Sequence, residues 1–292
     1  MKYKLTHTTN YNYTDPVPVS HNLLHLTPRE RNRQHTRDQR ILVRPQPAFT
    51  GRRTDYFGNP VDYFSIHEAH SKLTVTSNCR LEVTAAEPPN LKQSLPWKDM
   101  ADQLKQATTP ALLEAFQFVF PSARIRISEE LANYARESFH PNRPILDATM
   151  ELTHRIHKDF KYETASTNVN TRLEEVFEHR RGVCQDFAHV QIACLRSLGL
   201  AVRYVSGYLR SYPPPGSPRL VGADASHAWI SIYAGEQGWI DFDPTNDKIP
   251  SDEHVTVSWG RDYNDVCPIQ GVFVGGGNHT MSVSVDLMPL EE

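Results

Sequence analysis

The chain has 292 residues, of which 39% are hydrophobic and 22% charged, and its formal net charge is −3 at pH 7. This composition is typical of a globular protein with one large domain or two smaller ones, and its charge argues against a nucleic-acid partner. No run approaches the ~18 apolar residues of a membrane-spanning helix, so no membrane partner is expected.

The cysteines are scattered along the chain at Cys79, Cys184, Cys194 and Cys267. Without Cys-x-x-Cys spacing they indicate neither a zinc site nor a disulfide framework, so we expect no metal and no cofactor. The first residues also lack the apolar segment of a signal peptide. We therefore expect a cytoplasmic protein, where reducing conditions keep a catalytic thiol usable.

Residues 1–87 are expected to form an antiparallel β-sandwich. Residues 3–13 alternate at period two, and short strand-like runs follow at 41–43, 61–66, 73–76 and 81–84. Residues 56–60, Tyr-Phe-Gly-Asn-Pro, carry strong turn chemistry between two of these runs. We find no catalytic constellation in this domain.

The composition then changes, and prolines interrupt a polar stretch that predicts a linker. Residues 88–143 are expected to hold this linker and helices at about 111–120 and 128–139. Residues 144–292 are expected to form the catalytic core, starting with a helix after Pro144. Alternating segments at 255–290 are expected to complete the sheet of this core.

Cys184 falls in the first turn of an expected helix that Gly199 ends. Apolar residues recur at helical spacing along it, at Phe187, Val190, Cys194 and Leu198. The unpaired N–H groups and the dipole of a helix start favour a thiolate, and the same N–H groups could hold an oxyanion. The alternative interpretation is a small residue that is simply buried at a helix start.

A thiol nucleophile needs a base and a group that orients the base, and an expected hairpin can supply both. Its strands are residues 227–233 and 239–243. A three-residue loop at 235–237 would place Asp243 diagonal to His227, with Asp241 one step further away. The sequence therefore favours Asp243 over Asp241 as the orienting carboxylate.

Three motifs then resemble those of the transglutaminase-like superfamily. They are Arg-Gly-Val-Cys-Gln-Asp-Phe-Ala-His at 181–189, Asp-Ala-Ser-His-Ala-Trp-Ile at 224–230 and Gly-Trp-Ile-Asp-Phe-Asp-Pro-Thr-Asn at 238–246. The resemblance implies a nucleophile at Cys184, a base at His227 and an orienting carboxylate at Asp243. Residues 26–29 and 55–59 also resemble the N-terminal β domain of bacterial members.

The resemblance implies an α+β protein in which a papain-like core follows the N-terminal β-sandwich. In such a core a helix bearing the cysteine packs on an antiparallel sheet that bears the histidine and the aspartate. We expect a thiol-dependent acyl-transfer enzyme that hydrolyses a peptide or amide bond. The alternatives are a protein-glutamine transglutaminase and a non-catalytic peptide-binding module of the same fold.

Overall fold

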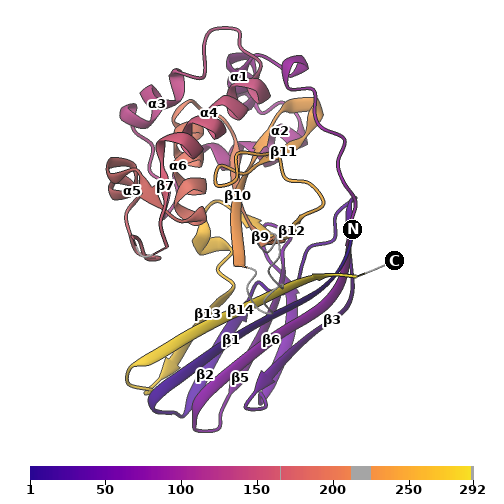
Figure 1. Ribbon diagram of the computed structural model, residues 1–292, viewed down its shortest axis with the longest axis vertical. Coiled ribbons are helices and arrows are strands. Elements are labelled where there is room, and N and C mark those ends of the chain that lie inside the picture. The colour runs from indigo at the N-terminus through magenta and orange to yellow at the C-terminus, as the bar shows by residue number, and fades with distance from the viewer. Residues whose placement is uncertain (165, 212–224, 291–292) are drawn as a thin grey trace, which may run out of the picture.

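The computed structural model describes residues 1–164, 166–211 and 225–290. A β-sandwich lies at one end of the molecule, and a second sheet covered by helices lies at the other (Figure 1). Residues 213–216, Pro-Pro-Pro-Gly, predict an irregular loop that runs to residue 226, and most of this stretch lies outside the described residues. Among the described residues, no helix combines the length and the apolar character needed to cross a membrane.

Two four-stranded sheets form the sandwich, and all their neighbouring strands are antiparallel. In sheet order, the first comprises β14 (His279–Pro289), β1 (Lys2–Val17), β6 (His70–Val83) and β3 (Gln34–Arg44). The second comprises β13 (Ile269–Val274), β2 (Val19–Leu24), β5 (Pro60–Ile66) and β4 (Phe49–Thr54). Leu24, Phe64 and Val75 belong to the apolar core between the sheets, as the alternating burial of β1 and β6 requires.

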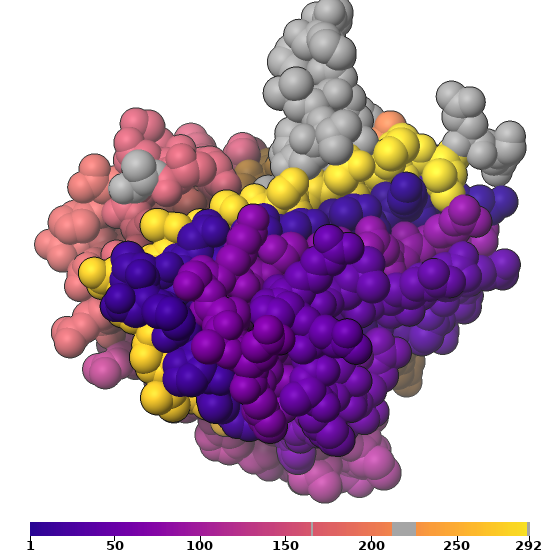
Figure 2. All heavy atoms as spheres, turned by 90° about the horizontal axis from the view of Figure 1, so that it is seen from below, coloured from indigo at the N-terminus to yellow at the C-terminus, as the bar shows by residue number. Residues whose placement is uncertain are grey.

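The expectation that segments at 255–290 complete the sheet of the catalytic core is confirmed for β12 (His254–Gly260), which pairs with β9 (Val202–Leu209), and is wrong for β13 and β14. β14 pairs with β1 from Tyr3↔Pro289 to Tyr13↔His279, and β13 pairs with β2. Figure 2 shows the yellow C-terminal segment lying along the indigo N-terminal strand. Period-two alternation identifies a strand but not its partner, so the range 144–292 combines the core with two strands of the sandwich.

Six α-helices lie among the described residues, and all of them precede the strands of the core sheet in the chain. They are α1 (Trp97–Gln106), α2 (Pro110–Phe116), α3 (Glu129–Arg136), α4 (Ile145–Asp159), α5 (Leu173–His179) and α6 (Cys184–Ser197). Short 3-10 helices are η1 (Leu91–Gln93), η2 (Gln117–Val119), η3 (Gly235–Gln237) and η4 (Tyr263–Asp265). The expected helix at 111–120 is thus α2 followed by η2, and the expected helix at 128–139 is the shorter α3.

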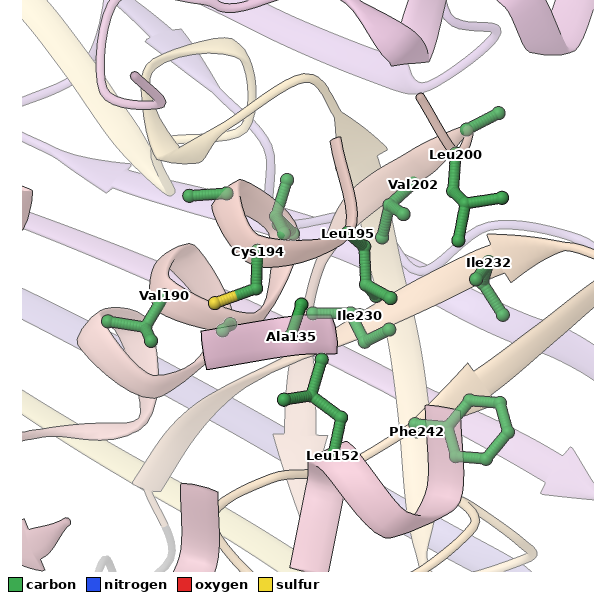
Figure 3. Packing of buried hydrophobic residues seen from close by; sticks show 14 of the residues in the cluster. Ala135, Leu152, Val190, Cys194, Leu195, Leu200, Val202, Ile230, Ile232 and Phe242 are labelled. Atoms are coloured by element: carbon green, nitrogen blue, oxygen red, sulfur yellow. The ribbon is translucent and has the colours of Figure 1, made fainter. Parts of the chain in front are cut away.

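The core sheet has the strand order β11 (Trp239–Phe242), β10 (Ala225–Tyr233), β9 (Val202–Leu209) and β12 (His254–Gly260). Helix α6 packs on it, and Figure 3 shows Leu195 beside Ile230, with Cys194 and Val190 further along the helix. Helices α1, α2 and α3 contribute Leu104, Leu112 and Leu131 to the same apolar core. The helices of residues 88–143 therefore belong to this core rather than to a free linker.

A short strand pairing braces the start of α6. A two-residue parallel pairing joins β7 (Lys161–Tyr162) to β8 (Arg181–Gly182), directly before Cys184. The short helix α5 leads the chain to this point. Residues 171–174, Thr-Arg-Leu-Glu, predict a capping box at its start, and the structure does not form it. Arg172 is the N-cap residue, and its side chain makes no capping hydrogen bond. The Thr171 hydroxyl instead accepts from the Asn168 backbone N–H.

The sandwich packs directly against β9 and β12. Leu5, Leu81 and Leu287 from the sandwich share an apolar cluster with Tyr208 and Val255 from the core sheet. Burying these side chains against one another removes apolar surface from water at ~25 cal/mol per Å², which holds the sandwich against these two strands.

Asn59 is the polar counterpart of this apolar contact, and it is fully buried. Its amide oxygen accepts from the Trp259 backbone N–H at 2.9 Å, and its amide nitrogen donates to the Trp259 carbonyl at 2.8 Å. Arg29 donates to the same amide oxygen at 2.5 Å and lies 3.5 Å over the Trp259 ring. One side chain of the sandwich thus pairs the backbone of β12 as a neighbouring strand would.

We expect Asn59→Ala to lower the free energy of unfolding by about 3 kcal/mol, because buried groups of Trp259 and Arg29 lose their partners. Urea denaturation of the full chain measures this change. Asn12→Ala, an exposed position on β1, is the matched control and should cost less than about 0.5 kcal/mol. Equal stability of the two variants would show that Asn59 does not hold the two parts together.

Candidate active site

Cys184 is the first residue of α6, and its side chain is half-buried. Asp186, two residues later, folds back so that its Oδ2 accepts from the Val183 backbone N–H at 2.9 Å and from the Thr167 hydroxyl at 2.6 Å. This carboxylate lies against Gly182, where an added Cβ would come within 2.6 Å of Oδ2. Gly182 therefore gives Asp186 the room to cap the helix that begins at Cys184.

His227 and Asp243 meet across the hairpin of β10 and β11. The observed register pairs Tyr233 with Trp239 and Ser231 with Asp241. The same register places Asp243 opposite Trp229, so the register predicted from a loop at 235–237 is confirmed. His227 Nε2 donates to Asp243 Oδ2 at 2.7 Å, and both side chains are buried.

Asp243 accepts hydrogen bonds from other groups besides His227. Its Oδ1 accepts from the backbone N–H groups of Thr245 at 2.9 Å and of Asn246 at 3.2 Å. Its Oδ2 accepts from His254 Nε2 at 3.1 Å and from the Asn246 side-chain amide at 2.8 Å, besides His227. Burial raises the pKa of Asp243, but the hydrogen bonds from His227 and His254 lower it more, so the group stays a carboxylate.

The environment of His227 favours an imidazolium. Burial lowers its pKa, but hydrogen bonds to Asp243 and to Cys184, and the charges of both, raise it to about 10. Because Nε2 already faces Asp243, the other ring nitrogen, Nδ1, is the one left for the thiol of Cys184. The three side chains therefore stand in the order thiol, imidazole and carboxylate.

Asp241 lies on the same face of the hairpin but belongs to a different network. Its Oδ2 accepts from Trp229 Nε1 at 3.3 Å and from Arg31 Nη1 at 3.4 Å. Burial raises its pKa, and the charges of Arg31 and Arg203 together with hydrogen bonds lower it by more. The carboxylate that accepts from His227 is therefore Asp243, the one that the strand register favours.

From the sequence, His189 and Cys194 are predicted to be poor candidates for a base or a nucleophile, because they lie on other faces of the helix than Cys184. His154 and His157 are predicted to lie on a solvated face. Cys194 is fully buried in the core, and His189 is buried with its Nε2 accepting from the Tyr263 amide at 3.3 Å. His154 and His157 on α4 are exposed, as expected of a solvated face. Even so, they bond the turn after Asp243, His154 to the Asp247 carboxylate at 2.7 Å and His157 to the Thr245 carbonyl at 2.9 Å.

The sequence did not predict three residues that lie next to Cys184, His227 or Asp243. They are Asn246, His254 and Asp186. Asn246 lay inside the third motif, three residues after Asp243, and an Asp-Pro-Thr-Asn turn is a signal that could have found it. His254 had no such signal. It comes from β12, which reaches Asp243 only because β12 pairs with β9 in the folded sheet.

Comparison with known proteins agrees with this geometry. The model of the transglutaminase-like superfamily matches residues 132–244, and that of the bacterial transglutaminase-like N-terminal region matches residues 3–82. The chain belongs to the transglutaminase-like superfamily. It is a bacterial-type member, in which the N-terminal region is the sandwich and the core carries Cys184 and His227.

Relatives of this transglutaminase-like protein cover its full length. The uncharacterized Mycobacterium tuberculosis protein Rv2569c is 40% identical over 99% of this chain and 93% of its own. A solved structure from Cytophaga hutchinsonii, described as that of a candidate cysteine protease, has the same fold, with a TM-score of 0.75 at 22% identity over 100% of this chain and 92% of that one. A protein-glutamine gamma-glutamyltransferase of Pseudomonas aeruginosa is 32% identical over 32% of this chain and 14% of its own length.

Proposed function

We propose that this transglutaminase-like protein is a thiol-dependent enzyme that hydrolyses a peptide or amide bond through Cys184, His227 and Asp243. The observation that carries the proposal is the buried hydrogen bond of 2.7 Å between His227 and Asp243, with the thiol of Cys184 on the other side of the imidazole. A peptide-binding module has no need of a buried carboxylate that accepts from five donors.

In the proposed reaction the proton of the Cys184 thiol passes to His227 Nδ1, which forms the thiolate–imidazolium pair that the raised pKa of His227 favours. The thiolate then attacks the substrate carbonyl. The first N–H groups of α6, those of Cys184 and Gln185, have no acceptor within the helix and would hold the oxyanion. His227 then protonates the leaving amine. Water, activated by the same imidazole, hydrolyses the thioester and releases the acid.

We favour hydrolysis over transfer of the acyl group to an amine. Water is present at ~55 M and accepts the acyl group unless the site excludes it. Cys184 is itself half-buried, and Tyr162 beside it is 50% exposed. Burial and then the neighbouring Cys184 and Asp186 raise the pKa of this tyrosine. The partial exposure of both side chains supports water as the acceptor.

Activity profiling of the purified full chain tests the proposal. Peptide, glutamine-donor and isopeptide substrates are offered with and without a primary amine, and products are identified by mass spectrometry. Release of an amine with a free acid product, and its loss in Cys184→Ala, supports hydrolysis. An amine-linked product that outweighs the acid would make the protein a transglutaminase. Binding of peptides with no turnover and no acyl-enzyme would make it a binding module.

Cys184 should also be the first cysteine to react with limiting iodoacetamide near neutral pH, because it is partly exposed at a helix start beside an imidazole. Cys79 and Cys194 should react far more slowly, since burial raises the pKa of each to about 12. Peptide mapping by mass spectrometry measures the order. The half-buried Cys267 is the internal comparison, and its labelling ahead of Cys184 would contradict the assignment.

A further inference from the structure

Three ligand-type atoms from three separate segments converge on one point beside the proposed nucleophile. His227 Nε2 lies 2.7 Å and His254 Nε2 lies 3.1 Å from Asp243 Oδ2, and the three ligand atoms all lie within 4.8 Å of one another. All three residues are buried, at 8%, 4% and 0% exposure. Nothing in the proposed acyl transfer requires a second histidine on the carboxylate.

We propose that His227, Asp243 and His254 form a zinc-binding site whose occupation inhibits the enzyme. Two imidazole nitrogens and one carboxylate oxygen are a donor set that zinc accepts, with bonds of about 2.0–2.2 Å. In a tetrahedral site such bonds set the ligand atoms about 3.3 Å apart. The present separations of 2.7 and 3.1 Å need only small outward movements to reach that value.

The surroundings orient these ligands as a metal site requires. Asp243 Oδ1 is fixed by two backbone N–H groups, so the carboxylate can bind a metal through Oδ2 when the metal takes the place of the imidazole protons that Oδ2 now accepts. The Asn246 amide lies 2.8 Å from Oδ2 and 3.2 Å from His227 Nε2, so turning the amide over would offer its oxygen as a fourth ligand.

His254 also faces a second environment. It lines a cavity of about 430 Å³ between the sandwich and the core sheet, together with Trp229 and Asp241. Its Nδ1 is buried without a protein partner among the described residues.

Inhibition follows from the position of the metal on the imidazole. Zinc at Nε2 would displace the proton that Nε2 donates to Asp243 and would leave the single ring proton on Nδ1, so Nδ1 could no longer accept the proton of the thiol. Cys184 faces the opposite side of the ring and is not a ligand in this proposal. The inhibition rests on the proposed function, whereas the binding of zinc does not.

Zinc binding to the full chain, measured by competition with a chromogenic chelator, tests the site. We expect one tightly bound zinc, unchanged affinity in Cys184→Ser, and affinity weakened by about 100-fold or more in His254→Gln. His140→Gln, at an exposed position, is the matched control and should bind as the parent does. No binding, or loss of binding in Cys184→Ser with retention in His254→Gln, would overturn the site.

Because His254→Gln changes a buried side chain, a second measurement avoids that variant. Cobalt(II) added to Cys184→Ser should give the visible absorption of a tetrahedral ion with nitrogen and oxygen ligands, and cobalt in the parent should show no thiolate charge-transfer band. Such a band in the parent would place the metal on Cys184 and overturn the proposal. If zinc binds as expected but no substrate is ever turned over, the proposed function fails and the metal site stands.

Discussion

Replacing His227 with Gln should lower the rate of single-turnover acylation by roughly 10⁶-fold, the loss seen when the base of a comparable triad is removed. His227 is expected to matter this much because it has two partners at once. Its Nε2 donates to a buried carboxylate, and its pKa is raised to about 10 by Asp243 and Cys184 against the effect of burial. Glutamine keeps part of the shape but accepts no proton at neutral pH.

The measurement is rapid-quench acylation by the purified variant, with a substrate found by the profiling described above. His140→Gln is the control for a histidine change at the surface, and circular dichroism establishes that the variants are folded. Cys184→Ala should form no acyl-enzyme. An acylation rate in His227→Gln within about tenfold of the parent, well short of the loss expected of a base, would assign the base to another residue.

Replacing Asp243 with Asn should cost about 10⁴-fold in the same rate, because an amide can hold His227 in the wrong tautomer. Asp241→Asn is the matched control on the same face of the same hairpin, and we expect it to be far milder. Asp241 bonds Trp229 and Arg31 rather than the imidazole. If Asp241→Asn proves the more damaging while both variants stay folded, the orienting carboxylate has been misassigned.

Asp243 and His227 should determine how the free energy of unfolding depends on pH. The pKa of Asp243 is lowered from 3.8, so its contribution is present above pH 3.8 and is lost as the pH falls. The pKa of His227 is raised from 6.5 to about 10, so its contribution is full below pH 6.5 and is lost as the pH rises toward 10. The stability lost in Asp243→Asn should therefore be largest between pH 3.8 and 6.5.

Several elements of the site could be predicted because local sequence determines them. The start of α6 at Cys184 follows from the apolar spacing after Gly182 and the stop at Gly199. The position of Asp243 relative to His227 follows from the parity of a short hairpin loop, and the observed register agrees. Alternation at period two likewise predicted β1 as a strand. In each case the information lies within about twenty consecutive residues.

Other features depend on which distant segments meet, and local patterns carry no information about that. The strands β13 and β14 were predicted as strands but assigned to the wrong sheet, because alternation gives a strand a buried face and not a neighbour. Asn59 has an ordinary turn sequence around it, yet its amide pairs the backbone of Trp259, 200 positions away.

His254 is the clearest case of a contact that local sequence patterns do not predict. By itself the sequence determined the thiol at a helix start, the hairpin that brings His227 to Asp243, and the motifs of the superfamily, because each is set by short-range spacing. Only the tertiary structure decided that a second histidine reaches Asp243 Oδ2, at 3.1 Å. That contact requires β12 to pair with β9, and such pairing is chosen by burial of whole faces rather than by the residues around His254.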